Sequence, residues 1–221
     1  MTVFDDELNS LKQKVLTMGS MVENALKDSI RSLVERNNDL ARAVIGNDHR
    51  VNALDVEIDE ESIRMIALRQ PMASDLRFIT TAMKITTDLE RMGDLAVNIA
   101  ERALELNEEP VLKPYIDIPR MQQIAQKMTR DALDAFVRKD EQLARDVIMR
   151  DDEVDYLKHE VLKELALFMV QDPATVTRAM KVSFIAQYLE RLADHATNIA
   201  EMVIYLVKGK LIRHMDTSRD R

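Results

Sequence analysis

The sequence predicts an all-α protein built as two tandem antiparallel three-helix bundles that are related by internal duplication. Helix breakers are few, because the 221 residues include only 4 glycines and 5 prolines. The stretch DLERMGDLAVNIAE at 88–101 recurs as YLERLADHATNIAE at 188–201, with nine of fourteen positions identical. Three of the five prolines lie within 107–121, between the two copies, where they prevent a continuous helix.

The duplication extends beyond this motif and defines the domain boundaries. The segment LARAVIGND at 40–48 resembles LARDVIMRD at 143–151, and Pro71 corresponds to Pro173. A repeat of this length indicates that each half is one structural unit with the same plan. We therefore expect an N-terminal bundle at 1–108, a linker at 109–116, a C-terminal bundle at 117–209 and a basic tail at 210–221.

Turn signals divide each half into three helices. The segments RNND at 36–39 and RKDE at 138–141 offer Asn or Asp as N-caps between the first and second helices. Pro71 and Pro173 mark the next turns, and Asp172 reads as an N-cap before a proline at the first helical position. These signals predict helices at 5–36, 38–69, 72–106, 118–138, 140–170 and 173–208.

The third and sixth helices carry apolar residues at alternating spacings of four and three. This spacing predicts a continuous core seam and a left-handed bundle, and short turns favour antiparallel neighbours. The seam comprises Phe78, Ala82, Ile85, Leu89, Met92, Ala96, Ile99, Ala103 and Leu106 in the third helix, and Val182, Ile185, Leu189, Leu192, Ala196, Ile199, Val203 and Leu206 in the sixth.

The duplicated motif also keeps a polar stripe on the helix face opposite the seam, as 100° per residue dictates. Carboxylates at i and i+4 repel, at a cost of roughly 0.2–0.5 kcal/mol per exposed pair. Their presence in both copies indicates neutralisation by a metal, by a partner, or by Arg91 and Arg191. The stripes are Glu90, Asp94, Asn98 and Glu101 in the first half, and Glu190, Asp194, Asn198 and Glu201 in the second.

The second helix of each half adds polar residues at the same spacing. Asp151 and Asp155 correspond to Asp48 and Asn52, and these pairs would share a space with the stripes if the helices pack side by side. Oxygen ligands suit iron, manganese, magnesium or calcium better than structural zinc. His159 could join this face as a further ligand or remain a solvated surface residue. Ordinary solvated acidic faces are the alternative interpretation.

Composition argues against several other functions. The net charge of −8 and the lack of a basic stripe make a nucleic-acid binder improbable. No apolar run approaches the ~20 residues of a membrane span, so we expect no membrane insertion. The absence of cysteine and of a recognisable signal peptide suits a cytoplasmic protein. The locally basic tail could be a solvated end or a contact with a membrane surface or partner.

The sequence also lacks recognisable catalytic motifs. Its four glycines are scattered, so no phosphate-binding loop is present, and its four histidines suggest no Ser–His–Asp set. A ferritin-like metallo-oxidase is an alternative, although such proteins use Glu-x-x-His inside the bundle and the sequence contains no such motif. A purely structural helical adaptor is a further alternative, but it does not explain the doubled acidic stripe.

The segment QPMASDLR at 70–77 and the two copies of the duplicated motif resemble the PhoU family over residues 5 to 208. The resemblance implies a cytoplasmic, non-enzymatic negative regulator of phosphate uptake and of the phosphate-starvation response. It also implies a homodimer whose partners are the phosphate ABC transporter and a membrane sensor histidine kinase. The implied metal is iron first, then zinc, manganese, magnesium or calcium. Its implied ligands are Asp48, Asn52, Glu90, Asp94, Asp151, Asp155, Glu190 and Asp194.

Asn52 departs from this acidic pattern. An amide offers a metal only a neutral oxygen, so we expect the C-terminal site to hold metal more tightly than the N-terminal site. Two further residues, Arg77 and Arg178, begin helices after the proline turns. We expect them to pair with nearby acids, with a contact to a partner or to phosphate as the alternative.

Overall fold

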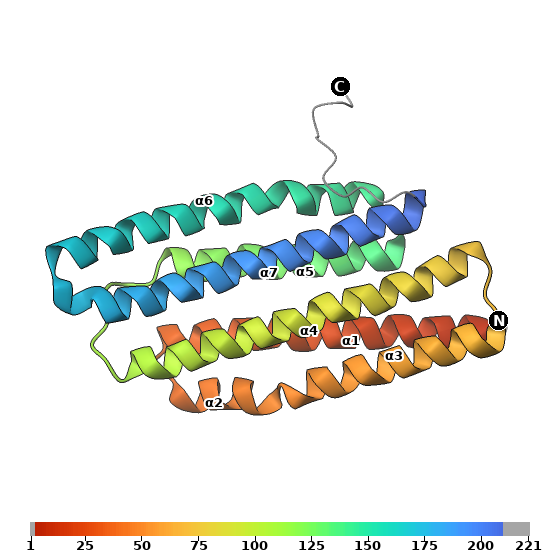
Figure 1. The fold of residues 1–221 in the computed structure, drawn as a ribbon, viewed down its shortest axis with the longest axis horizontal. Helices are drawn as coiled ribbons and strands as arrows, with labels where there is room; N and C mark the ends of the chain where they lie inside the picture. The colour runs from red at the N-terminus through yellow and green to blue at the C-terminus, as the bar shows by residue number, and fades with distance from the viewer. Residues whose placement is uncertain (1–2, 210–221) are drawn as a thin grey trace, which may run out of the picture.

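The computed structural model describes residues 3–209, and the basic tail expected at 210–221 lies outside this range. Within the described range the chain is helical and contains no strand (Figure 1). The elements are α1 (Val3–Val34), α2 (Asn38–Asn47), α3 (His49–Arg69), α4 (Ala73–Asn107), α5 (Asp117–Arg138), α6 (Glu141–Gln171), the 3₁₀ helix η1 (Pro173–Thr175) and α7 (Val176–Lys208).

The predicted helix at 38–69 is interrupted at Asp48, so it forms α2 and α3. Side chains around this point bond to backbone carbonyls and compete with the helical hydrogen bonds. The Asn47 amide donates to the Ala43 carbonyl oxygen at 2.8 Å, and His49 Nδ1 lies 2.8 Å from the Gly46 carbonyl oxygen. The matching stretch of α6 contains no glycine or asparagine, and α6 is continuous.

The first turn of each half has the same construction. Arg36 and Lys139 adopt left-handed backbone conformations, with φ of 53° and 54°. The Asn37 and Asp140 side chains then accept hydrogen bonds from the N–H groups three residues ahead, at 3.0 and 3.1 Å. Both N-caps predicted from the sequence are therefore confirmed. At the later turn Asp172 caps η1, so the sixth predicted helix starts as a 3₁₀ turn before α7.

The two bundles pack against each other along their length. In Figure 1, α6 lies along one edge of the molecule and α2 and α3 along the opposite edge, with α1, α4, α5 and α7 between them. Helix α4 packs on α7, and α1 packs on α5. The predicted seam residues are all buried, and all of them except Ala96 belong to one core that runs through both bundles. This arrangement confirms the predicted fold class.

Close packing joins the bundles at two places. The rings of Phe78 on α4 and Phe136 on α5 are stacked, with centroids 4.8 Å apart and planes at 12°. Gly19 on α1 faces Leu133 on α5 so closely that a Cβ at Gly19 would lie 2.2 Å from Leu133 Cδ1. The bundles therefore share an interior, which fixes the acidic faces of α4 and α7 relative to each other.

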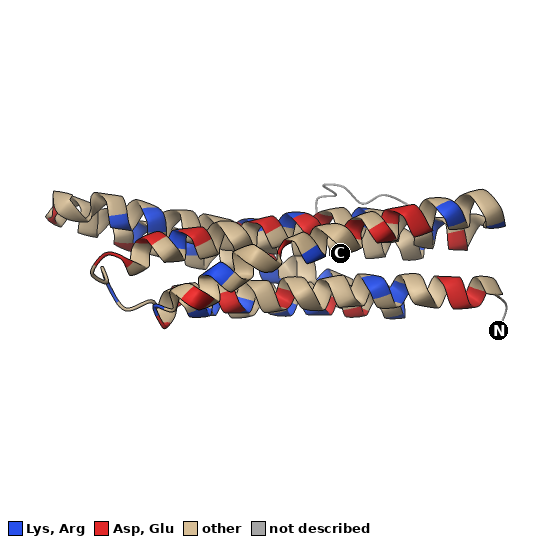
Figure 2. Ribbon diagram, turned by 90° about the horizontal axis from the view of Figure 1, so that it is seen from below, with Lys and Arg blue, Asp and Glu red and all other residues tan. Residues whose placement is uncertain are grey.

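None of the described helices combines the length and the apolar character needed to cross a membrane. Charged residues instead run along most of the helices, with acidic and basic side chains interspersed (Figure 2). Most of the charged side chains therefore lie on the outer faces of the helices.

Candidate metal site on the acidic helix faces

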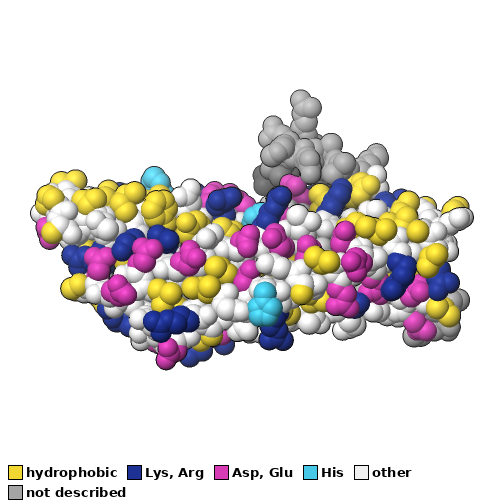
Figure 3. Space-filling model, turned by 60° about the horizontal axis from the view of Figure 1, so that its bottom comes forward, with side chains coloured by type: hydrophobic (Ala, Val, Ile, Leu, Met, Phe, Trp, Pro, Cys, Tyr) yellow, Lys and Arg dark blue, Asp and Glu magenta, His cyan; other side chains and the backbone are white. Residues whose placement is uncertain are grey.

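The acidic stripes lie on the solvent side of α4 and α7, as the sequence predicts. Glu90 and Glu190 are half-buried, whereas Asp94 and Asp194 are exposed. The opposite faces of both helices form the core seam. One face of the molecule carries many acidic side chains along its length, interspersed with basic ones (Figure 3).

In the second half, α6 and α7 bring four predicted carboxylates together. Burial first, and then the charges of Asp194, Asp155 and Glu190, raise the pKa of Asp151 from 3.8 to about 6. Burial also raises the pKa of Asp194, with a second contribution from Glu190. These mutual effects show that the two i, i+4 pairs face a shared space, so each carboxylate destabilises the charge of its neighbours.

A lysine that the sequence analysis did not single out lies in this cluster. The Lys158 ammonium bonds to Asp155 at 3.1 Å and to Glu190 at 2.8 Å. Burial disfavours the charged lysine, but these bonds outweigh it and raise the pKa of Lys158. The cluster therefore already contains one internal cation. The spacing of three from Asp155 places Lys158 on the same face, and this was the signal that could have found it.

In the first half, Asp48 at the α2–α3 break lies near Glu90 and Asp94 on α4. Burial raises the pKa of Glu90, and the charges of Asp94, Asp55 and Asp48 raise it further. Burial and then Asp48 raise the pKa of Asp94. Asp55 is a fourth carboxylate that sequence reasoning missed, although it stands three residues after Asn52 on the same helical face.

Asp55 and Lys158, which the sequence analysis did not single out, occupy equivalent positions in the two halves and change the balance of charge between the two clusters. Asp55 and Lys158 are 103 residues apart, the same offset as Asp48 and Asp151. The N-terminal cluster therefore has four carboxylates, and Asn52 donates its amide to Asp48 Oδ2 at 2.9 Å. The C-terminal cluster has four carboxylates and an ammonium group. The carboxylate count is thus equal in the two clusters, and the expectation of tighter metal binding in the second half stays a prediction.

The donor set fits a hard cation in chemistry, because carboxylates from two helices repel one another without one. Among residues 3–209, no group of three or more His, Asp or Glu side chains is arranged to hold a metal ion. A metal would therefore require new side-chain rotamers, including movement of Lys158 away from Glu190 in the second half. In the second half Lys158 pairs with Asp155 and Glu190, and in the first half Asn52 bonds to Asp48.

The secondary candidates have different surroundings. Asn198 lies 3.4 Å from Asp88 Oδ1, a contact from α7 to α4 rather than to α6. His195 Nδ1 lies 2.8 Å from the same Asp88 oxygen, so its ring points toward α4. Thus Asp88 and His195, where the two copies differ, contribute to the contact between bundles. His159 is exposed on α6, as are Arg91 and Arg191 on their helices.

Three other polar candidates remain on the stripes. Asn98 is half-buried and Glu101 is exposed on α4, where Glu101 lies 3.8 Å from Arg102. Glu201 is half-buried on α7. These positions continue the stripes by one and two turns beyond the carboxylate pairs.

The arginines after the proline turns lie at the far end of the opposite bundle. Arg178 donates to the Pro110 carbonyl oxygen at 3.1 Å and lies 3.9 Å from Glu109, so its predicted pairing with an acid is confirmed. The Arg77 guanidinium lies beside Gly209 at the C-terminal end of α7. A cation is favourable near a helix C-terminus. Arg178 therefore ties the start of α7 to the segment after α4. Among residues 3–209 no acid pairs with Arg77, whose Nε has no hydrogen-bond partner, so the pairing predicted for Arg77 is wrong.

Together, the fold and the site define the class of protein: two three-helix bundles related by duplication, with acidic clusters on their outer helix faces. The PhoU domain model matches residues 15–103 and 118–203, which are the two halves. The chain belongs to the PhoU family. It is 46% identical over 208 residues to the phosphate-specific transport system accessory protein PhoU homolog of Aquifex aeolicus, covering 94% of each chain.

Further relatives extend this similarity. The phosphate-specific transport system accessory protein PhoU of Escherichia coli K12 is 37% identical over 212 residues, with 96% of this chain and 88% of that protein covered. The crystal structure of PhoU from Pseudomonas aeruginosa superimposes with a TM-score of 0.90 at 40% identity, covering 94% of this chain and 100% of that chain. The phosphate transport system regulatory protein PhoU from Streptococcus pneumoniae gives 0.88 at 30% identity, covering 95% and 99%.

Proposed function

We propose that this chain is a cytoplasmic, non-enzymatic regulator of phosphate homeostasis. It would act as a homodimeric adaptor between the phosphate ABC transporter and its sensor histidine kinase, and would repress phosphate uptake and the phosphate-starvation response. The observation that carries this proposal is the match over 94% of the chain to a relative named as an accessory protein of phosphate-specific transport. The long helical faces with interspersed charges suit an adaptor that contacts more than one protein.

We further propose that the acidic faces bind metal, with iron first and zinc, manganese, magnesium or calcium as alternatives. In the first half, Asp48, Glu90, Asp94 and the newly found Asp55 would be the ligands. In the second half they would be Asp151, Asp155, Glu190 and Asp194. A bound cation would remove the carboxylate repulsion that raises the pKa of these groups, and it would clamp neighbouring helices together.

Lys158 would compete with metal in the second half. Its ammonium group bonds to Asp155 and Glu190 and already neutralises part of the cluster. Replacing it with a neutral side chain of similar length should therefore strengthen metal binding in that half. We expect Lys158→Met to raise the affinity of the C-terminal site, whereas Lys163→Met, an exposed lysine on the same helix, should leave it unchanged. A chelator titration with bound metal counted at each step measures both.

The internal pairing of Lys158 also favours a second candidate, a structural adaptor whose acidic faces need no metal. A cell assay combined with site variants separates the two. Deletion of the gene should derepress a phosphate-starvation reporter in phosphate-rich medium, and the wild-type gene should restore repression. Loss of repression by Glu190→Gln with Asp194→Asn supports the metal-dependent regulator. Full repression by that variant supports the structural adaptor, and an unchanged reporter in the deletion strain contradicts the regulatory role itself.

The control for these variants is Asp39→Asn, which removes a carboxylate that is 97% exposed in the first turn of α2. Its expression level, helicity and repression should match the wild type. Equal loss of repression in the control and in the site variant would show that the stripe has no special role.

A further inference from the structure

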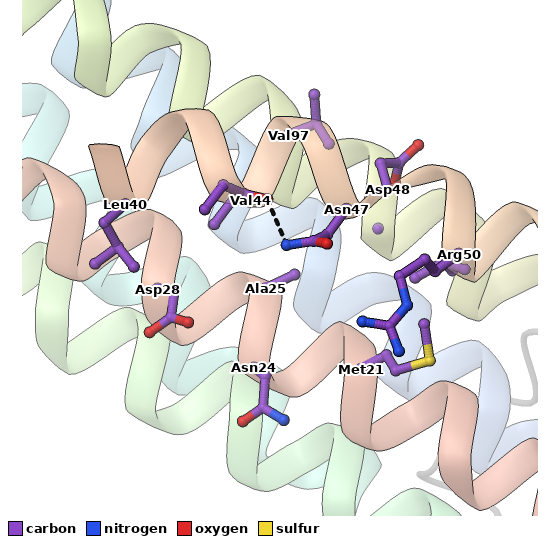
Figure 4. A pocket seen from close by; sticks show the side chains of 13 residues that line it. Met21, Asn24, Ala25, Asp28, Leu40, Val44, Asn47, Asp48, Arg50 and Val97 are labelled. Carbon is purple, nitrogen blue, oxygen red and sulfur yellow. Dashed lines mark hydrogen bonds between the residues drawn. The ribbon is translucent and has the colours of Figure 1, made fainter. Parts of the chain in front are cut away.

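A pocket of about 200 Å³ opens in the first half among α1, α2, α3 and α4. Figure 4 shows Asp28 and Leu40 at one end of it, Met21 and Arg50 at the other, and Asn47 between. Its lining combines apolar residues such as Ala25 and Val44 with polar residues such as Asp28 and Asn47. This pocket lies beside the interruption at residue 48. Asp48, a proposed metal ligand, lines it, whereas the acidic stripe residues of α4 do not.

The internal duplication explains why the pocket is open. An offset of 103 residues aligns the N-caps, the left-handed turn residues and the second helices of both halves. By this offset Ala25 corresponds to Met128, and Asn47 corresponds to Arg150. Ala25 and Asn47 are thus smaller than their counterparts, whereas the lining residues Asp28, Leu40 and Val44 are the same in both halves. The pocket is the volume that the longer side chains occupy in the second half.

Core packing shows the same difference. In the first half a small apolar cluster is separated from the main core, whereas its counterparts in the second half belong to the main core. The separated residues are Ala41, Val44 and Ala100, and their counterparts are Ala144, Val147 and Ala200. The space between α1 and α2 therefore lacks side chains that would connect the cluster with the rest of the interior.

The second half shows what chemistry fills this space. There Arg150 on α6 reaches Asp131 on α5 and forms an ion pair with it. The first half keeps the carboxylate at the equivalent position, Asp28, but has Asn47 in place of the arginine. Asp28 contacts Arg31 at 3.3 Å, and both side chains are partly exposed, so this local pair contributes little. The acidic half of the pair is present, and the cation from the neighbouring helix is missing.

We propose that the pocket accepts an arginine side chain of a partner protein, which replaces the missing internal arginine. Its guanidinium would bind the Asp28 carboxylate and the Asn47 amide oxygen, since the Asn47 amide nitrogen already donates to Ala43. Its aliphatic stem would cover Ala25 and Val44. Arg50 lies at the opposite end of the pocket and repels a second cation there, which orients the guanidinium toward Asp28.

The test is a titration of the full chain with N-acetyl-L-arginine methylamide, followed by NMR of the backbone amides and methyl groups. Saturable shifts should be confined to α1, α2 and the start of α3. The matching citrulline derivative has the same shape without the charge, and it should bind at least about tenfold more weakly. Absence of saturation by 100 mM, equal binding of citrulline, or shifts spread over the acidic stripes would overturn the proposal.

Two variants fill the pocket in the manner of the second half. Asn47→Arg supplies the internal cation, and Ala25→Met supplies the missing volume, so each should abolish the localised shifts while helicity is retained. Binding that survives in both folded variants contradicts the assignment. Free arginine that binds more tightly than the capped derivative would assign the pocket to a small metabolite and overturn the inference of a partner protein.

A converse variant tests the chemistry in the second half. Met128→Ala with Arg150→Asn should open the equivalent space beside Asp131, and the arginine derivative should then shift resonances of α5 and α6. If the arginine derivative does not bind there, an aspartate beside an open pocket is not enough to bind arginine. That result would contradict the proposal, which rests on the comparison of the two halves. Because Asp48 lines the pocket, the titrations are made in excess chelator, and none of them depends on phosphate regulation.

Discussion

Asp151→Asn should stabilise the metal-free protein at pH 7. The native pKa of Asp151 is raised from 3.8 to about 6, chiefly by burial, so ionisation at pH 7 opposes folding. One unit of pKa difference corresponds to about 1.4 kcal/mol, which gives about 3 kcal/mol for this rise. Asp151 is partly exposed, and solvent screening reduces the expected gain to about 1.5 kcal/mol. The asparagine variant removes this penalty.

The pH window follows from the same pKa values. Because the native state keeps its proton to a higher pH than the unfolded state, the contribution of Asp151 to stability falls as pH rises from about 4 to 6. The advantage of Asp151→Asn should therefore be absent at pH 4 and complete above pH 7. Urea unfolding in excess chelator at both values measures it, and Asp39→Asn, which removes a carboxylate that is 97% exposed, is the control. A variant less stable than wild type at pH 7, or a gain of equal size at pH 4, would refute this reasoning.

Other predictions concern the packing and the caps, and urea unfolding tests each. Gly19→Ala should lower stability by roughly 1–3 kcal/mol, because its Cβ would overlap the buried Leu133. Gly93→Ala should be neutral or stabilising by up to about 1 kcal/mol, since its Cβ meets Asp48 at 3.4 Å; equal effects of the two would contradict the packing argument. Asn37→Ala should cost about 1 kcal/mol through loss of the N-cap, and an unchanged midpoint would deny that role.

The sequence predicts those parts of the fold that depend on local patterns. Heptad spacing determines the seam, and the residues Asn37 and Asp140 identify the first turn of each half. The duplication identifies the acidic stripes as special, because two divergent copies keep the same polar positions. Backbone periodicity then places each stripe on the outer helix face, and the structure confirms this placement.

Tertiary contacts explain what the sequence does not predict. The interruption at Asp48 arises from competing side-chain bonds that a helical pattern does not reveal. The place of Lys158 between two carboxylates depends on the packing of α6 against α7. The contact of Asp88 with His195 depends on how α4 meets α7. Each of these features depends on residues far apart in the chain or on competition between local hydrogen bonds. The spacing of residues along the sequence predicts neither.

The central claim is that the doubled acidic stripes are cation sites. Elemental analysis of the protein purified without a metal-affinity tag tests it most directly, with a variant in which Glu90, Asp94, Glu190 and Asp194 are all changed to the matching amides. The account predicts that the wild type carries bound metal, with iron foremost, and that the variant carries none while keeping its helical circular dichroism. Metal-free wild type, or a folded variant with the full metal content of the wild type, would contradict the claim.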